Sequence, residues 1–212
     1  IGRELIDIWH QCGVRTISTR TVGYEHIDWK YAKELGISVS NVSYTPHTVA
    51  EYTVMTMLMA IRKMKTILTR YMGQDYSLTG IRGRELCHMT VGVIGTGKIG
   101  ETVIRLLSSF GCRILAYSRT EKDSVKAYAR YCGLETLYRE SDLITLHAPA
   151  TPDTFHMINR DSLASMKDGV VLINMARGSL IDTSSLIEAL ESGKVGAAAL
   201  DVLEDEGRIY YR

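Results

Sequence analysis

A recurring junction between helices and strands constrains the fold of this 212-residue chain more than any other feature. At four places a helix-like stretch ends in glycine, and a strand-like run of mainly aliphatic and β-branched residues follows at once. Glycine tolerates the left-handed backbone that closes a helix, so such junctions are typical of loops leading from a helix to a strand. The four runs are Val14–Thr19 after Gly13, Ile37–Val42 after Gly36, Arg113–Tyr117 after Gly111 and Val195–Leu200 after Gly193.

Three further apolar runs show little polar alternation, which is typical of strands buried on both faces. These runs are Val91–Ile94, Leu143–Leu146 and Val170–Ile173. Strands that alternate with helical segments of about 10–15 residues predict an α/β fold with parallel sheets. We therefore expect a doubly wound parallel sheet from about residue 90, preceded by an incomplete second α/β lobe.

The character of the chain changes twice and predicts three parts. Residues 1–45 hold two βα-type units, too few to close a sheet alone, and we expect them to be part of a second domain. Residues 46–89 are expected to form a linking helix and a linker. The helix is apolar on nearly every side over 50–67, which predicts burial in a core or against a second subunit, and hence a homodimer. Residues 90–212 are expected to form a dinucleotide-binding domain.

A glycine-rich turn directly follows the apolar run Val91–Ile94 and opens an amphipathic segment at Ile99–Phe110. Its glycines, Gly95, Gly97 and Gly100, have the G-x-G-x-x-G spacing of a dinucleotide fingerprint, in the strand–turn–helix context that the fingerprint requires. Gly95 would permit the tight turn, Gly97 a close approach to a pyrophosphate and Gly100 close packing of the helix. A glycine-rich turn without a ligand is the alternative, which this context disfavours.

The end of the next strand bears on the choice between NAD and NADP. An acidic residue about 20 residues after the turn normally holds the ribose hydroxyls of NAD. Here Ser118 and Arg119 stand at the strand end, with Lys122 close behind. A missing carboxylate and an added cation favour NADP. In the alternative, Arg119 stacks on the adenine and NAD is used.

Polar residues at the later strand ends are the next candidates, because ligands of open α/β sheets bind at the carboxyl ends of the strands. Arg177 could grip a substrate carboxylate in a bidentate fork, and Asp201 and Glu206 follow the last strand. A surface salt bridge and a solvated acidic loop are the structural alternatives. The six histidines include no clear acid or base, and His147 resembles a structural turn residue.

Composition excludes several classes of function. A net charge of +1 without a basic stripe argues against a nucleic-acid partner, and the apolar run at 54–61 is too short to cross a membrane. The four cysteines form no C-x-x-C pair, so we expect no metal site, no disulfide framework and a cytoplasmic location. The chain begins with Ile1 and shows no secretory signal, so we expect it to be a fragment.

Six motifs, in order and at matching spacing, resemble the D-isomer-specific 2-hydroxyacid dehydrogenases. They are TRTVGYEHID, NVSYTPHTVAEY, VGVIGTGKIG, LHAP, NMARGSLID and AALDVLEDE. The resemblance spans essentially the whole chain. FGCRILAYSR and DVLEDE are most similar to the D-lactate dehydrogenases of the vancomycin-resistance type.

The resemblance implies roles for individual residues. Arg177 matches the catalytic arginine that orients the 2-oxo acid, and Glu206, rather than Glu204, matches the glutamate paired with a catalytic histidine. Substrate contacts are implied for the amides of Val22 and Gly23 and for Tyr44. Dinucleotide contacts are implied for Lys98, Ile99, Ser118, Ala148, Pro149, Thr154, Met175, Ala176 and Asp201.

The activity implied by the resemblance is hydride transfer from NADH or NADPH to pyruvate or a similar 2-oxo acid, giving the D-2-hydroxy acid. The family's catalytic histidine would lie downstream of Glu206, beyond Arg212, and about 50 residues or more would precede Ile1. We therefore expect these 212 residues alone to be inactive. A dinucleotide-sensing binding protein or co-repressor on the same scaffold is the alternative, because fold does not fix function.

Overall fold

A computed structural model of the chain describes residues 1–21, 23, 24 and 26–206. It contains two compact units, Ile1–Thr45 and Pro46–Arg212. The roles predicted for residues 1–45 and 46–89, and the domain boundary predicted at residue 90, remain predictions.

The first unit is a small α/β lobe with two parallel strands. Thr16 of β1 lies opposite Ser38 of β2, and two helices pack on the strands. Each helix is followed by a glycine with positive φ, 83° at Gly13 and 74° at Gly36, as the glycine junctions predict. The elements are α1 (Arg3–Gln11), β1 (Thr16–Thr19), α2 (Trp29–Glu34) and β2 (Ser38–Asn41). The expected incomplete α/β lobe is thus confirmed.

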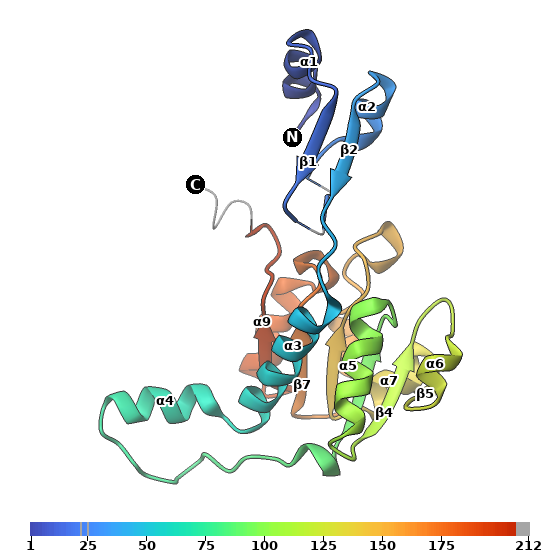
Figure 1. Cartoon of the computed structure of the whole chain (residues 1–212). Coiled ribbons are helices and arrows are strands. Elements are labelled where there is room, and N and C mark those ends of the chain that lie inside the picture. The colour runs from blue at the N-terminus through green and yellow to red at the C-terminus, as the bar shows by residue number, and fades with distance from the viewer. Residues whose placement is uncertain (22, 25, 207–212) are drawn as a thin grey trace. The chain divides into compact units, whose positions relative to one another are not determined.

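The second unit is built on a six-stranded parallel sheet with the order β5-β4-β3-β6-β7-β8 (Figure 1). Chain order runs outward from β3 in one direction and from β6 in the other, which is the doubly wound arrangement. The strands are β3 (Thr90–Ile94), β4 (Arg113–Tyr117), β5 (Arg130–Tyr131), β6 (Leu143–Leu146), β7 (Val170–Asn174) and β8 (Val195–Leu200). The predicted fold class is confirmed.

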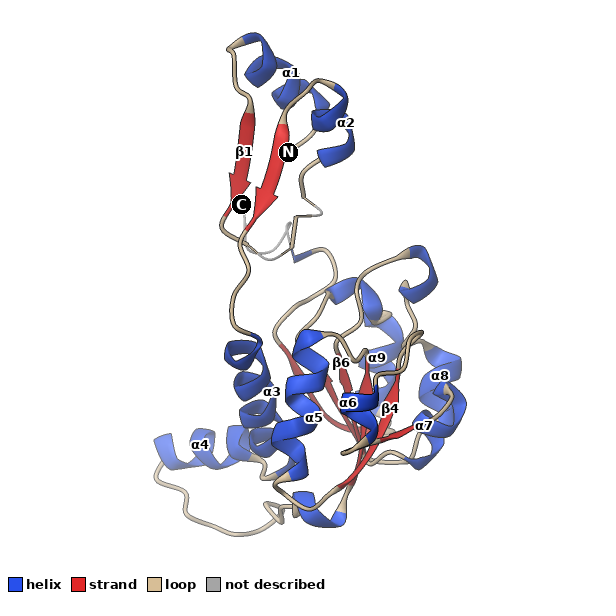
Figure 2. Cartoon of the chain, turned by 45° about the vertical axis from the view of Figure 1, so that its right-hand side comes forward, coloured by secondary structure: helices blue, strands red, loops and turns tan. Residues whose placement is uncertain are grey.

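Helices cover both faces of this sheet (Figure 2). One face packs against α3, α5 and α6 through a cluster that includes Met57, Ile104 and Val125. The other face packs against α7, α8 and α9 through a cluster that includes Leu137 and Leu186. The helices are α3 (Pro46–Ile61), α4 (Met64–Met72), α5 (Lys98–Ser108), α6 (Asp123–Lys126), α7 (Leu134–Glu140), α8 (Arg160–Ser165) and α9 (Thr183–Glu191). Short 3₁₀ turns are η1 (Leu86–His88), η2 (Pro152–Thr154) and η3 (Gly178–Leu180).

The single apolar helix expected over 50–67 is divided into two helices, which corrects that expectation. α3 ends at Ile61, whose carbonyl accepts a hydrogen bond from the amide of Arg84 at 3.0 Å. Lys63 then takes a left-handed backbone with φ 53°, and α4 begins at Met64. A partner from a later segment thus ends the helix. Neither α3 nor any other helix in the described part of the chain is long and apolar enough to cross a membrane.

Candidate functional site

The carboxyl ends of five parallel strands line up at one edge of the sheet. Ile94 of β3 lies opposite Tyr117 of β4 and Leu146 of β6. Leu146 lies opposite Asn174 of β7, which lies opposite Leu200 of β8. The segments that follow these residues therefore share the edge where ligands of open α/β sheets bind. This edge brings together the predicted residues of 95–100, 118–119, 148–149, 175–177 and 201.

The glycine-rich turn is packed so tightly that side chains are excluded at two of its positions. Gly95 has φ 95°, and a Cβ atom there would lie 2.6 Å from the carbonyl carbon and oxygen of His147. A Cβ atom on Gly100 would lie 1.9 Å from the carbonyl oxygen of Gly95. The first turn of α5 is therefore pressed onto the loop that leads into it, as the fingerprint requires.

Gly97, the residue before α5, has different surroundings. A Cβ atom on it would meet nothing within 4 Å, so this glycine borders open space. Gly97 also has no side chain to cap the amides of the first helical turn, which includes Lys98 and Ile99. Unpaired amides and the positive end of the helix dipole favour an anionic group there. The turn thus fits the pyrophosphate of a dinucleotide.

His147 lies directly after β6, against the glycine-rich turn. Its Nε2 atom is 3.0 Å from the hydroxyl oxygen of Thr145. Burial lowers the pKa of His147 to about 4. The ring is therefore neutral at pH 7, which does not suit a histidine that must donate a proton as an imidazolium.

The loop after His147 is held together by hydrogen bonds to the side chain of Thr154. The hydroxyl of Thr154 donates to the carbonyl of Pro149 at 2.7 Å and accepts from the amide of Thr151 at 2.8 Å. Ala148 is buried and Pro149 is exposed. These bonds hold the predicted cofactor contacts Ala148, Pro149 and Thr154 in one compact loop.

The strand end at which the sequence predicts a choice between NAD and NADP has one contact that the sequence did not suggest. Ser118 is half-buried and Arg119 is exposed. Lys122 does not stand alone, because its Nζ atom lies 3.1 Å from Oε2 of Glu101 on α5. The hydrogen bond from Lys122 lowers the pKa of Glu101. The positive charge that the sequence suggests at Lys122 is therefore balanced by a carboxylate.

Arg177 stands on a turn held by the buried side chain of Asn174. Asn174 donates from Nδ2 to the carbonyl of Arg177 at 2.9 Å and accepts from the amide of Ala176 at 3.0 Å. The guanidinium of Arg177 donates to the carbonyl of Ala176 at 2.7 Å. Met175 is buried. Asn174 was missed from sequence; its signal is a polar residue that ends an otherwise apolar strand.

The acidic segment after β8 is tied to the same asparagine. The amide of Asp201 donates to the carbonyl of Asn174 at 3.0 Å, while the residue itself is exposed. Farther on, the amide of Leu203 donates to Oε2 of Glu206 at 3.2 Å, and the amide of Glu206 donates back to the carbonyl of Leu203 at 3.3 Å. Glu206 therefore closes a tight turn at the end of the described residues.

Two of the predicted substrate contacts, Gly23 and Tyr44, lie in loops of the first unit. The hydroxyl of Thr21 donates to the carbonyl of Gly23 at 2.6 Å. Tyr44 is exposed, and its hydroxyl donates to the carbonyl of Arg20. Val22 lies outside the described residues. The substrate roles of Val22, Gly23 and Tyr44 remain predictions.

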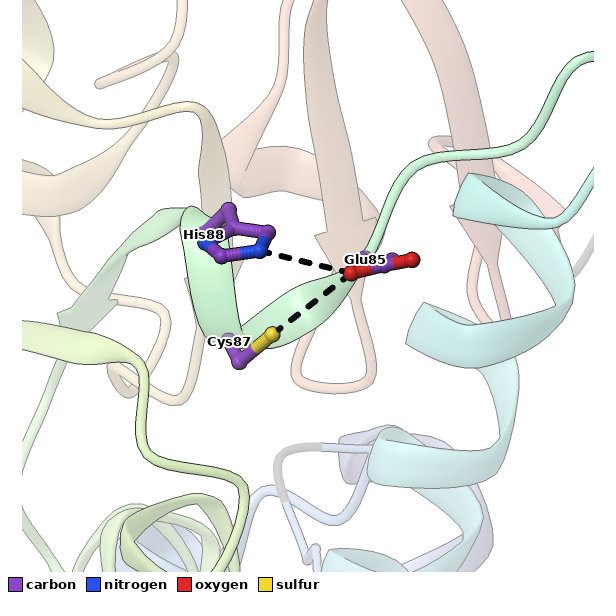
Figure 3. Close-up of side chains that lie close together, drawn as sticks. All are labelled: Glu85, Cys87 and His88. Atoms are coloured by element: carbon purple, nitrogen blue, oxygen red, sulfur yellow. Dashed lines mark hydrogen bonds and ion pairs between the residues drawn. The ribbon is translucent and has the colours of Figure 1, made fainter.

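One surface cluster has metal-ligand chemistry that the cysteine spacing did not suggest. Glu85, Cys87 and His88, at η1, place one ligand atom each within 4.8 Å of one another (Figure 3). All three residues are exposed, and His88 Nε2 lies 3.4 Å from Glu85 Oε2. Exposed acidic groups of this kind are common without a metal ion. The contact between His88 and Glu85 is therefore adequately explained as a polar contact on the surface.

Comparison with known proteins decides the family. Residues 54–209 match the family described as "D-isomer specific 2-hydroxyacid dehydrogenase, NAD binding domain". The chain belongs to this family. The resemblance drawn from the sequence motifs is therefore confirmed, and the second unit contains the NAD-binding domain of a D-2-hydroxyacid dehydrogenase.

Relatives and solved structures of D-2-hydroxyacid dehydrogenases agree with this assignment. A D-specific alpha-keto acid dehydrogenase of Enterococcus faecalis is 50% identical, with 94% of this chain and 60% of the relative aligned. An aromatic 2-oxoacid reductase of Clostridium sporogenes is 46% identical, with 99% and 64% aligned. The structure of D-lactate dehydrogenase from Aquifex aeolicus complexed with NAD and lactic acid superimposes with a TM-score of 0.91 at 39% identity, covering 100% of this chain and 64% of that one. This chain thus spans less than two thirds of the length of these relatives.

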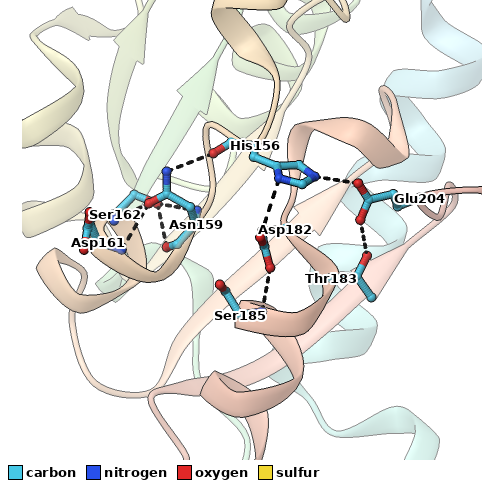
Figure 4. A network of polar contacts seen from close by, with 8 residues as sticks. All are labelled: His156, Asn159, Asp161, Ser162, Asp182, Thr183, Ser185 and Glu204. Atoms are coloured by element: carbon cyan, nitrogen blue, oxygen red, sulfur yellow. Dashed lines mark hydrogen bonds and ion pairs between the residues drawn. The ribbon is translucent and has the colours of Figure 1, made fainter.

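Sequence reasoning missed a polar network on this D-2-hydroxyacid dehydrogenase chain, centred on His156 (Figure 4). Two of its members are helix caps: Asp182 accepts from the amide of Ser185 at 2.8 Å, and Asn159 caps α8. Such caps have a local sequence signal, a polar residue just before a helix. The bond between His156 and Glu204 has no local sequence signal, because these residues are 48 positions apart.

Proposed function

We propose that the whole protein transfers hydride between NADH or NADPH and a 2-oxo acid, giving a D-2-hydroxy acid. Pyruvate is the first candidate substrate, with D-lactate as its product. The observation that carries this proposal is the placement of Arg177 and the glycine-rich turn at the same sheet edge. A cation that can grip a carboxylate and a turn that fits a dinucleotide are thus supplied by one rigid scaffold.

Different residues of this chain would bind the cofactor, orient the substrate and hold the catalytic histidine. Amides at Gly97 and the start of α5 would hold the pyrophosphate, and Ser118 the adenosine ribose. Arg177 would orient the 2-oxo acid through its carboxylate, and Glu206 would hold a catalytic histidine protonated. When bound, the nicotinamide supplies the hydride that reduces the carbonyl carbon. The lowered pKa of His147 argues against that residue as the proton donor.

A panel of 2-oxo acids tests this function. Pyruvate, a branched-chain 2-oxo acid and phenylpyruvate would each be assayed with NADH and with NADPH. We expect oxidation of the cofactor with at least one acid and formation of the D isomer only. Binding of the dinucleotide without turnover of any acid would favour the sensing protein instead. The cytoplasmic location and the absence of a nucleic-acid partner remain predictions from composition.

Cofactor preference is proposed to depend on Ser118. We expect NADPH to be used at least as well as NADH, because no carboxylate at position 118 repels a 2′-phosphate. The pairing of Lys122 with Glu101 weakens the electrostatic case for NADPH, so Arg119 is the cation on which the preference rests.

Replacement Ser118→Asp is expected to move the ratio of kcat/KM for NADPH over NADH toward NADH by about ten- to a hundredfold. One lost charge-assisted contact is worth ~1.5–3 kcal/mol, and each factor of ten corresponds to about 1.4 kcal/mol. Ser109→Asp is the matched control, since it adds the same charge at the opposite end of α5. An unchanged ratio in Ser118→Asp would remove residue 118 as the selector.

A homodimer packed through α3 is proposed from the surface of that helix. One side of α3 is buried in the second unit, yet Tyr52, Met55 and Met59 on the helix are 43%, 46% and 39% exposed. A groove of about 990 Å³ beside it is lined largely by apolar residues, including Met64 and Ile67. An exposed apolar patch of this kind is typical of a subunit interface.

Sedimentation of the whole protein is therefore expected to show a dimer at micromolar concentration. The double replacement Met55→Glu, Met59→Glu should give a monomer, because charges buried without partners oppose association. Ile187→Glu, at an apolar residue that is 50% exposed on α9, is the control and should leave the dimer intact. A wild-type monomer would contradict the proposal.

A further inference from the structure

His156 lies where three loops of the second unit meet (Figure 4). Its own loop follows β6, and the ring contacts carboxylates from the other two loops. Nε2 of His156 is 2.5 Å from Oε1 of Glu204, in the segment after β8. Nδ1 is 3.5 Å from Oδ2 of Asp182, in the segment after η3. The imidazole thus bridges the segment that carries Arg177 and the segment that carries Glu206.

The backbone around His156 is fixed on the side of Arg177. Its φ angle is 49°, in the left-handed region, which histidine tolerates better than most residues. The amide of His156 donates to the carbonyl of Ser179 at 2.9 Å, and the amide of Asp182 donates to the carbonyl of Ile158 at 2.8 Å. The backbone that carries the His156 ring is therefore fixed to the loop that begins at Arg177, independently of the contact between the ring and Glu204.

Glu204 has a partner at each carboxylate oxygen. Besides His156 at Oε1, the hydroxyl of Thr183 donates to Oε2 at 2.9 Å. The hydrogen bond from His156 lowers the pKa of Glu204, so this carboxylate stays ionised at neutral pH. Thr183 is the first residue of α9. Two contacts to fixed elements define both the position and the rotation of the Glu204 side chain.

The loops that carry Arg177 and Glu206 also touch directly. A Cβ atom on Gly178 would lie 2.1 Å from the carbonyl carbon and oxygen of Leu203, and 2.3 Å from the amide nitrogen of Glu204. Backbone therefore rests on backbone at this point. If Glu204 moved, the turn from Leu203 to Glu206 would move with it. The distance between that turn and Arg177 would then change.

We propose that His156 and Glu204 are positioning residues, which hold the turn bearing Glu206 in register with the loop bearing Arg177. The inference rests on the proposed function, because it assigns Arg177 and Glu206 to the reaction. Neither His156 nor Glu204 is assigned any contact with substrate or cofactor. A misplacement of about 1 Å at reacting groups costs about a hundredfold in rate, so a fixed distance between the two loops has a direct effect on turnover.

The kinetic test uses Glu204→Ala and Glu204→Gln in the whole protein. Glutamine keeps an oxygen that accepts from His156, and its amide can donate to the Thr183 hydroxyl, whereas alanine keeps neither contact. We expect Glu204→Ala to lower kcat about ten- to a hundredfold, with the Kd for NADH within about twofold of wild type. Glu204→Gln should restore kcat to within about threefold. A purely stabilising carboxylate would lower Tm in the alanine variant and leave kcat unchanged.

Hydrogen exchange gives a readout that does not depend on activity. The amides of Asp201 and Glu206 are hydrogen-bonded in the native chain and should exchange faster in Glu204→Ala, but not in Glu204→Gln. Glu188→Ala is the matched control. It removes an ion pair of 2.5 Å between Arg160 and Glu188, which joins α8 and α9 without touching the segment after β8. It should change neither kcat nor exchange at 201–206.

The outcomes separate the two proposals. If the wild type reduces no 2-oxo acid, the proposed function fails, while exchange at 201–206 still decides whether Glu204 positions that segment. Native kcat and native exchange in Glu204→Ala would overturn the inference. If Glu204→Ala does not fold, Thr183→Val, which removes one of the two contacts, should show the same pattern with a loss of about three- to tenfold. A uniform rise in hydrogen exchange over the whole chain would show that His156 and Glu204 serve only the stability of the fold. That result would also overturn the inference.

Discussion

Replacement Arg177→Gln is expected to lower kcat/KM for 2-oxo acid reduction by about a hundred- to a thousandfold. The guanidinium fork matches a carboxylate in geometry and charge, and glutamine offers neither a charge nor two parallel donors. Asn174 holds the backbone of this turn through the carbonyl of Arg177, which the replacement leaves in place. The guanidinium also donates to the carbonyl of Ala176, but Asn174 still accepts from the amide of Ala176 after that bond is lost. The Kd for NADH, from a fluorescence titration, should therefore stay within about twofold of wild type.

Two further variants make the result specific to position 177. Arg177→Lys keeps the charge without the fork and should give an intermediate loss. Arg160→Gln removes an arginine whose side chain is 74% exposed on α8, and it should leave kcat/KM unchanged. Retention of wild-type kcat/KM in Arg177→Gln would exclude this arginine from the reaction.

Replacement Gly100→Ala is expected to impair folding and dinucleotide binding together. The new methyl group would lie 1.9 Å from the carbonyl oxygen of Gly95, which is backbone and cannot rotate away. Overpacking of this kind typically costs about 1–3 kcal/mol. The free energy of unfolding, measured with urea, should therefore fall by about 2–3 kcal/mol or more. The affinity for NADH should fall more than tenfold as the turn shifts, about 1.4 kcal/mol or more.

Gly97→Ala separates the two effects. Its methyl group would meet no protein atom within 4 Å, and its φ of −63° suits any residue. Stability should therefore change by less than about 1 kcal/mol, the usual cost of alanine before a helix. NADH binding should still weaken, because the methyl group would occupy the space proposed for the pyrophosphate. Equal stability losses in Gly97→Ala and Gly100→Ala would contradict this account of the turn.

Local signals in the sequence predicted the sheet well. β4 and β6 begin and end at the residues expected, Arg113–Tyr117 and Leu143–Leu146, because their apolar runs are bounded by glycine or polar residues. The parallel register then brought the predicted strand-end residues to one edge, without any need to know their contacts. These features depend on short-range pattern and on the shared geometry of parallel strands.

Features that depend on distant partners could not be predicted. The end of α3 is set by the amide of Arg84, which reaches the carbonyl of Ile61. The balance of charge at Lys122 is set by Glu101 on a preceding helix, and the environment of His156 by Glu204, 48 positions away. In each case the sequence supplies residues of suitable chemistry but does not indicate which of them meet.

The contact at Gly178 has a consequence for how this site can diverge. Because the backbone after Arg177 rests on the carbonyl of Leu203, we expect that neither loop can be exchanged without a matching change in the other. A chimaera that takes only one loop from a relative would bring together backbones that had not been matched to each other. Length changes in either loop should be tolerated only with compensating changes in the other. Substrate range would then evolve more readily in surfaces remote from this contact, while the pair of loops is inherited as one module.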